Sequence, residues 1–114
     1  MLRAIHLVLI PLLASACASG LGGAVSDFEA GRLPDAARGF RALEANFSSL
    51  GRREQARYAL FAGLTALALG DLGTAERWLL PLKVAVERNP ARLSDSERGA
   101  LFAALRSTGR MPGE

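Results

Sequence analysis

The segment GRLPDAARGF, residues 31–40, returns 39 positions later as GDLGTAERWL, residues 70–79. A glycine permits a tight reversal between two antiparallel helices, a leucine can plug the corner, and an alanine lets the second helix approach the first closely. Each copy therefore predicts a helix–turn–helix hinge, and the repeat predicts a chain built from helical hairpins. The matching pairs are Gly31 and Gly70, Leu33 and Leu72, Ala36 and Ala75, Arg38 and Arg77, and Phe40 and Leu79.

The sequence on both sides of this repeat also has the residue pattern of helices. Alanine, leucine and arginine are abundant, β-branched residues are few, and no stretch alternates with a period of two. We therefore expect an all-α fold without strands. Breaks are expected at Gly31, at residues 48–51, at residues 70–73, at residues 89–90 and at Gly109, which leaves about five helices.

Two prolines mark the helices that follow the repeated glycines. Pro34 precedes an apolar-periodic run and suits the first turn of a helix, which we expect to reach about Asn46. Pro81 falls inside the run from Thr74 to Asn89, where it removes a backbone hydrogen bond. The sequence therefore predicts either a kink at Pro81 or two shorter helices.

A capping box marks the start of the last helix. The Ser94 hydroxyl and the Glu97 carboxylate, three residues apart, can each satisfy a backbone donor at the helix start. This pattern predicts a helix from Asp95 to about Ser107. Two short repeats are fewer than the three that a stable solenoid usually needs, so we expect this C-terminal helix, or a partner, to cover the exposed end.

Within residues 24–90 the spacing resembles a tetratricopeptide repeat. The second unit has that family's two glycines, its alanine, its bulky apolar residue and its closing proline, at Gly63, Gly70, Ala75, Leu79 and Pro90. Pro90 comes three positions later than the family's pattern expects. The first unit has Ala24 in place of the first glycine. The resemblance implies antiparallel helical hairpins with a C-terminal capping helix. An unrelated helical bundle is the alternative.

The resemblance also implies a binding surface on the helix expected at residues 52–69. In the family this helix lines a concave groove that takes a partner's peptide or helix. The matching positions in this chain are Arg57, Leu60, Leu64 and Leu67. The other interpretation is that these leucines are core, because a helix that is apolar on most sides is usually central and buried.

The N-terminal segment has the marks of an export signal. Arg3 precedes an uncharged apolar stretch, residues 4–18, which is shorter than the roughly 20 residues that span a membrane. Small residues lead up to Cys17, the single cysteine. This pattern resembles the bacterial lipoprotein signal, in which cleavage precedes a lipidated cysteine. Ordinary secretion, an uncleaved signal anchor and a buried structural cysteine are the alternatives.

These interpretations divide the chain into four parts. Residues 1–16 are expected to be the signal peptide, residues 17–23 a lipidated flexible tether, residues 24–108 the helical-repeat domain and residues 109–114 a disordered tail. Ala18, rather than aspartate, follows the cysteine, which in the lipoprotein sorting pattern implies the outer membrane, facing the periplasm.

The composition argues against several classes of function. The formal net charge is +3, and the densest basic run, Arg52, Arg53 and Arg57, is interrupted by Glu54, so we expect no nucleic-acid partner. The single histidine, His6, belongs to the expected signal, and the single thiol would be acylated. We therefore expect no enzyme activity, no cofactor, no metal site and no small-molecule substrate.

Two classes of function remain. The first is a lipid-anchored protein–protein interaction module that assembles or stabilises an envelope complex, such as a secretin, pilus or outer-membrane machine. The second is a structural lipoprotein, a closed helical bundle that serves envelope integrity without a peptide-binding groove. Trp78 and Tyr58, aromatic residues with a polar edge, are equally common in interfaces and in cores.

Overall fold

The computed structural model of the protein describes residues 20–109. This part of the chain is all-α: five α-helices and two short 3₁₀-helices, with no strand among the described residues. The all-α prediction is confirmed. The elements are α2 (Gly20–Glu29), α3 (Leu33–Leu43), η1 (Glu44–Ser49), α4 (Arg52–Ala68), α5 (Leu72–Arg88), η2 (Pro90–Arg92) and α6 (Asp95–Ser107).

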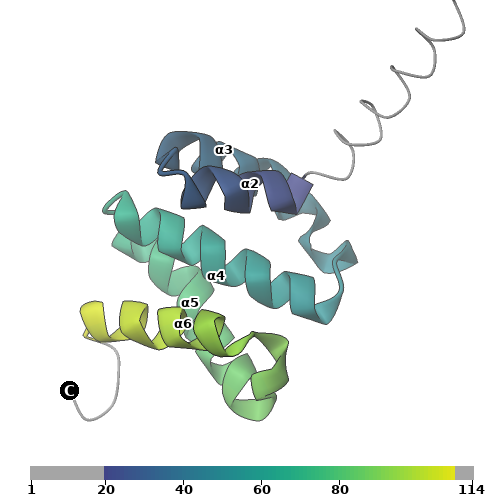
Figure 1. Cartoon of the computed structure of the whole chain (residues 1–114), viewed down its shortest axis with the longest axis vertical. Helices are drawn as coiled ribbons and strands as arrows, with labels where there is room; N and C mark the ends of the chain where they lie inside the picture. Colours follow the sequence, from purple (N-terminus) through teal and green to yellow (C-terminus); the bar gives the residue numbers. More distant parts are fainter. Residues whose placement is uncertain (1–19, 110–114) are drawn as a thin grey trace, which may run out of the picture.

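The helices pack mainly in sequential pairs. α2 lies on α3, α4 lies on α5, and these are the two most extensive contacts between elements. In Figure 1, α4 runs between the α2–α3 pair and α6, and it contacts all three of these helices. The central position of α4 explains why it is apolar on most sides.

The sequence repeat is also a structural repeat. Gly31 and Gly70 both adopt a left-handed backbone, with φ of 81° and 80°, which an L side chain would strain. Each turn closes with the same two backbone hydrogen bonds. One of the two is Arg32 N–H to Asp27 C=O in the first turn and Asp71 N–H to Ala66 C=O in the second. These are the bonds of a Schellman motif, which satisfies the last carbonyls of a helix.

Side chains in the repeat follow the prediction with one exception. The two repeat alanines, Ala36 and Ala75, are fully buried, which allows the close helix approach expected from them. Leu72, expected to plug the corner of its hinge, is instead 48% exposed. That prediction is wrong, because Leu72 is the first residue of α5 and lies outside both clusters of buried residues.

The helix ends agree closely with local sequence signals. The Ser94 hydroxyl accepts a hydrogen bond from the Glu97 amide, and the Glu97 carboxylate accepts one from the Ser94 amide, so the capping box is confirmed. α3 ends at Leu43 rather than near Asn46, because the chain tightens into η1. α5 continues through Pro81, so the alternative of two shorter helices is wrong.

The first helix begins earlier than the sequence indicated. Residues 20–23 already belong to α2 rather than to a tether that extends to residue 23. They contact the rest of the fold: a Cβ added at Gly20 would lie 3.0 Å from Leu43 Cδ2 on α3, and Leu21 packs on the neighbouring core. The expected signal, Cys17 and residues 110–114 lie outside the described residues.

Two clusters of buried side chains hold the helices together. One joins α4, α5 and α6 through Leu60, Leu79, Leu101 and Leu105, and the other joins α2, α3 and α4 around Tyr58. Both clusters contact Trp78. Among the helices of residues 20–109, none is both long enough and apolar enough to cross a bilayer.

The contact between α4 and α5 depends on the absence of a side chain at Gly63. A Cβ added there would lie 2.5 Å from Leu79 Cδ2 and 2.6 Å from Leu79 Cγ, and Leu79 is fully buried. We expect Gly63→Ala to lower the free energy of unfolding by about 2 kcal/mol, because overpacking outweighs the higher helix propensity of alanine. Chemical denaturation monitored by circular dichroism measures this change.

The matched control is Gly99→Ala in α6, where nothing lies within 4 Å of an added Cβ. This change should raise stability by up to about 1 kcal/mol. In a Leu79→Ala background, Gly63→Ala should also become stabilising. Equal effects of alanine at positions 63 and 99 in the natural background would show that the close contact is not energetically important.

Candidate functional site

The four residues that the repeat resemblance assigned to a groove do not form one open surface. Leu60 is fully buried, 0% exposed, and belongs to the core shared by α4, α5 and α6. Leu64 and Leu67 are half-buried against the same core. The core interpretation therefore holds for Leu60, and its assignment to a partner-binding surface is wrong.

Arg57, the fourth predicted residue, connects α4 to α6. Its Nε donates to Glu97 Oε2 at 3.0 Å, and its guanidinium lies 5.7 Å from the centre of the Phe61 ring. Burial would raise the pKa of Glu97, but the hydrogen bonds from Ser94 and Arg57 outweigh it and lower the pKa. This ion pair holds α6 over the side of α4 that carries Leu60.

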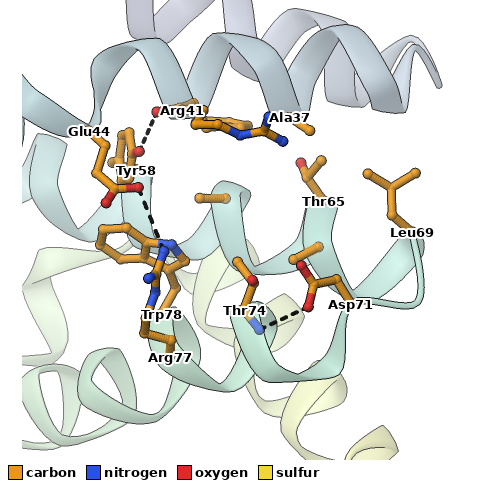
Figure 2. Close-up of a pocket in the computed structure, with 13 residues that line it drawn as sticks. Ala37, Arg41, Glu44, Tyr58, Thr65, Leu69, Asp71, Thr74, Arg77 and Trp78 are labelled. Carbon is orange, nitrogen blue, oxygen red and sulfur yellow. Dashed lines mark hydrogen bonds and ion pairs between the residues drawn. The ribbon is translucent and has the colours of Figure 1, made fainter.

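A different hollow lies on the other side of α4. It is a groove of about 410 Å³ between α3 and α5, with α4 as its floor. Figure 2 shows side chains from α3, η1, α4 and α5 converging on it. We call this space the α3–α5 groove. Its lining residues are Ala37, Phe40, Arg41, Glu44, Tyr58, Ala62, Thr65, Ala66, Leu69, Asp71, Thr74, Arg77 and Trp78.

One end of the α3–α5 groove is built from aromatic rings. The Tyr58 ring lies 5.5 Å from Phe40 and 5.0 Å from Trp78, in edge-to-face arrangements that favour such pairs. The Tyr58 hydroxyl donates to the backbone carbonyl of Phe40, which ties α4 to α3. Burial raises the pKa of Tyr58 to about 12, and the Glu44 carboxylate adds to this rise.

The rim of the groove carries both signs of charge. Arg77 of α5 and Glu44 of η1 form an ion pair, 3.7 Å between Nη2 and Oε1, that crosses from one helix pair to the other (Figure 2). The Arg77 guanidinium also lies 5.6 Å from the centre of the Trp78 ring. Because both ionic side chains are largely exposed, this bridge is weak and can exchange with another partner.

The far end of the groove is shaped by the α4–α5 turn. Leu69, which lines the groove, is 46% exposed. Next to it, Asp71 caps α5 by accepting a hydrogen bond from the Thr74 amide at 3.2 Å. Hydrogen bonds from the Thr74 side chain and backbone hold the pKa of Asp71 below its usual range. This end therefore combines an exposed apolar side chain with a fixed negative charge.

The groove carries groups suited to binding. Trp78 at one end and a rim of mixed charge provide apolar contact area and hydrogen-bonding groups. Within residues 20–109, no three side chains among histidine, cysteine, aspartate and glutamate come together in a way that could hold a metal ion.

One sequence signal points to this groove. Trp78 occupies the repeat position where the first copy has Gly39, and this large aromatic residue lines the groove. In the sequence alone, Tyr58 and Trp78 are residues common to both interfaces and cores.

Comparisons with known proteins give no guide to function: no protein-family model, no curated protein and no solved structure matches the chain significantly.

Proposed function

We propose that the protein is a lipid-anchored interaction module of the bacterial envelope, whose tetratricopeptide-like hairpins hold a segment of a partner protein in the α3–α5 groove. The anchor is Cys17, acylated after removal of residues 1–16. Partners of this kind belong to envelope assemblies, such as a secretin, pilus or outer-membrane machine. The single observation that carries the binding role is the groove itself, with Trp78 at one end and a charged rim.

Three features of the groove support this proposal. Trp78 supplies a half-buried, rigid aromatic ring, the kind of residue that dominates binding energy in interfaces, and the buried Tyr58 supports that ring edge-to-face. The Glu44–Arg77 bridge is exposed and therefore inexpensive to open. Leu69, 46% exposed at the far end, offers apolar area that a partner would cover.

A second candidate, a structural lipoprotein with a closed bundle, has its own supporting observation. α6 covers Leu60, and the exposed large apolar side chains of the described region are confined to Leu69, Leu72 and Val84. A surface this poor in apolar patches is typical of a protein that binds nothing tightly. The two candidates differ in whether the groove is occupied in cells.

Site-specific photo-cross-linking in cells separates the two candidates. A photoreactive amino acid at Leu69 should capture one partner, because this side chain lines the groove. The matched control is Val84, which is 48% exposed, compared with 46% for Leu69, and does not line the groove. Arg77→Glu, which reverses a charge on the rim, should reduce the capture at position 69 several-fold.

Two outcomes would contradict the proposal. Equal capture at positions 69 and 84, or none at position 69, would favour the structural lipoprotein. Labelled palmitate should enter the natural protein and fail to enter Cys17→Ser, which should also leave the membrane fraction. Label uptake by Cys17→Ser would refute the anchor without bearing on the groove.

A further inference from the structure

A second, smaller hollow lies beside the α3–α5 groove and shares Arg77 and Trp78 with it. Its volume is about 240 Å³, and its walls come from η1, α4, α5 and η2. Most of its surface is apolar, with Phe47, Trp78, Pro81 and Leu82 among the lining residues. We call this space the Arg92 hollow, after the arginine that η2 contributes to its wall.

Arg92 has an unusual environment for a charged side chain. Its Nε–H is buried and has no hydrogen-bond partner in the described part of the chain. No aspartate or glutamate lines the Arg92 hollow. A buried donor without an acceptor costs about 1–3 kcal/mol, and native proteins rarely leave one unmatched. Arg92 as a whole is only half-buried and lines the hollow, so the ends of its guanidinium, not the buried Nε–H, can meet an acceptor from outside.

The other arginine of the hollow is in a different state. Arg77 already pairs with Glu44 at 3.7 Å and stacks on Trp78. The positive charge of Arg77 is thus partly balanced within the chain. Arg92 is held in place by its neighbour, Leu93, which is 1% exposed and belongs to the core. The uncompensated charge of the hollow is that of Arg92.

We propose that the Arg92 hollow binds a carboxylate attached to a small apolar group. The carboxylate pairs with the guanidinium of Arg92, whose planar fork suits a carboxylate and which stays charged at every physiological pH. The apolar group lies against Trp78, Pro81 and Leu82. This inference rests on the hollow alone and stands whether or not the α3–α5 groove takes a partner.

The size of the hollow limits the ligand. A water molecule takes about 30 Å³ of liquid, so 240 Å³ corresponds to roughly eight non-hydrogen atoms. That is below the range of about 300–1,000 Å³ for sites that hold drug-sized ligands. Two sources have the required chemistry: a small free carboxylic acid, and the C-terminal carboxylate of a peptide with an apolar last residue.

Trp78 provides a direct readout of binding, because it is the single tryptophan of the chain and lines the hollow. The full chain, purified in an uncharged detergent, is titrated with hexanoate and with hexanamide while tryptophan fluorescence is recorded. The two probes have the same size and differ in charge. We expect hexanoate to bind at least about tenfold more tightly, because only the carboxylate forms an ion pair with Arg92.

A peptide arm distinguishes the two sources of carboxylate. The tripeptide Ala-Ala-Leu is compared as a free acid and as a C-terminal amide. Tighter binding of the free-acid peptide than of hexanoate identifies a protein C-terminus as the natural ligand, and the reverse order identifies a small acid. Either order supports the carboxylate site, provided that each acid binds more tightly than its amide.

The matched variants are Arg92→Gln and Arg88→Gln, which each remove one positive charge. Arg88 is exposed at the end of α5 and does not line the hollow. Arg92→Gln should weaken hexanoate binding about tenfold or more, and Arg88→Gln should leave it nearly unchanged. Circular dichroism verifies that both variants fold, and the comparison of acid with amide on the natural protein needs no variant.

Three results would overturn the proposal. One is a fluorescence response that is the same for hexanoate and hexanamide. Another is the absence of a response to all four probes, which would mean that the Arg92 donor is satisfied by water alone. The third is equal weakening of hexanoate binding by Arg92→Gln and Arg88→Gln, which would reduce the effect to general charge.

Discussion

Replacing Leu60 with alanine should lower the free energy of unfolding by about 3–5 kcal/mol. Leu60 is fully buried and packs in the cluster that contains Leu79, Leu101 and Leu105. Truncation there removes apolar contacts and leaves a cavity that fixed helices on three sides cannot fill. Leu64→Ala should cost about 1–2 kcal/mol, because Leu64 is only half-buried. Urea denaturation followed by circular dichroism measures both.

Leu69→Ala is the control for the Leu60 variant. It removes the same atoms from a side chain that is 46% exposed and should change stability by no more than about 0.5 kcal/mol. If Leu60→Ala were as stable as Leu69→Ala, the interpretation of Leu60 as a core residue would be wrong, and the prediction of a groove at Leu60 would stand. Leu60→Asp is not a useful test of the groove, because a charge at this buried position should unfold the chain. Loss of partner binding by that variant would therefore not show that Leu60 contacts the partner.

Local sequence signals were sufficient to predict the five α-helices of residues 20–109, but not η1 and η2. Gly31, Gly70 and the Ser94–Glu97 capping box each act within a few residues, so they can be read without knowing what packs where. The end of α3 was missed by a few residues, because the switch to η1 has no such marker. Local chemistry fixes a helix end more firmly than apolar periodicity does.

The start of α2 and the exposure of Leu72 could not be predicted from local signals. Gly20 is a poor helix former, yet it lies within α2, where it approaches Leu43 on α3 closely. Leu72 has the same place in its repeat as the half-buried Leu33, yet it is 48% exposed. Both outcomes depend on contacts between distant parts of the chain.

The candidate site was missed for the same reason. α4 is apolar on most sides, and its sequence does not say that α6 packs on the side with Leu60 while a groove remains between α3 and α5. The family resemblance assigned the groove to the covered side. The burial of the Arg92 Nε–H also has no sequence signal, because an arginine after a proline-led turn normally faces solvent.

Raising the pH from 10 to 12 should remove about 2 kcal/mol of stability through Tyr58 alone. The pKa of the phenol is about 10 in an unfolded chain and about 12 in the fold, where burial and then Glu44 raise it, opposed by Arg77. The folded state therefore holds its proton more tightly than the unfolded state. Its contribution to stability is complete below pH 10 and is lost as the pH rises through 12.

Tyr58→Phe isolates this effect, because the chain has a single tyrosine. Lysine side chains titrate in the same pH range, but Lys83 is the single lysine of the chain. At neutral pH the variant should be about 1 kcal/mol less stable, since the buried carbonyl of Phe40 loses its hydrogen bond. At pH 12 the order should reverse, with the variant about 1 kcal/mol more stable, because a phenyl ring has no proton to lose. Denaturation curves at several pH values, together with tyrosinate absorbance, locate the crossing. Parallel loss of stability in both proteins would mean that Tyr58 ionises as freely in the fold as in water, and that the aromatic end of the α3–α5 groove is open to solvent.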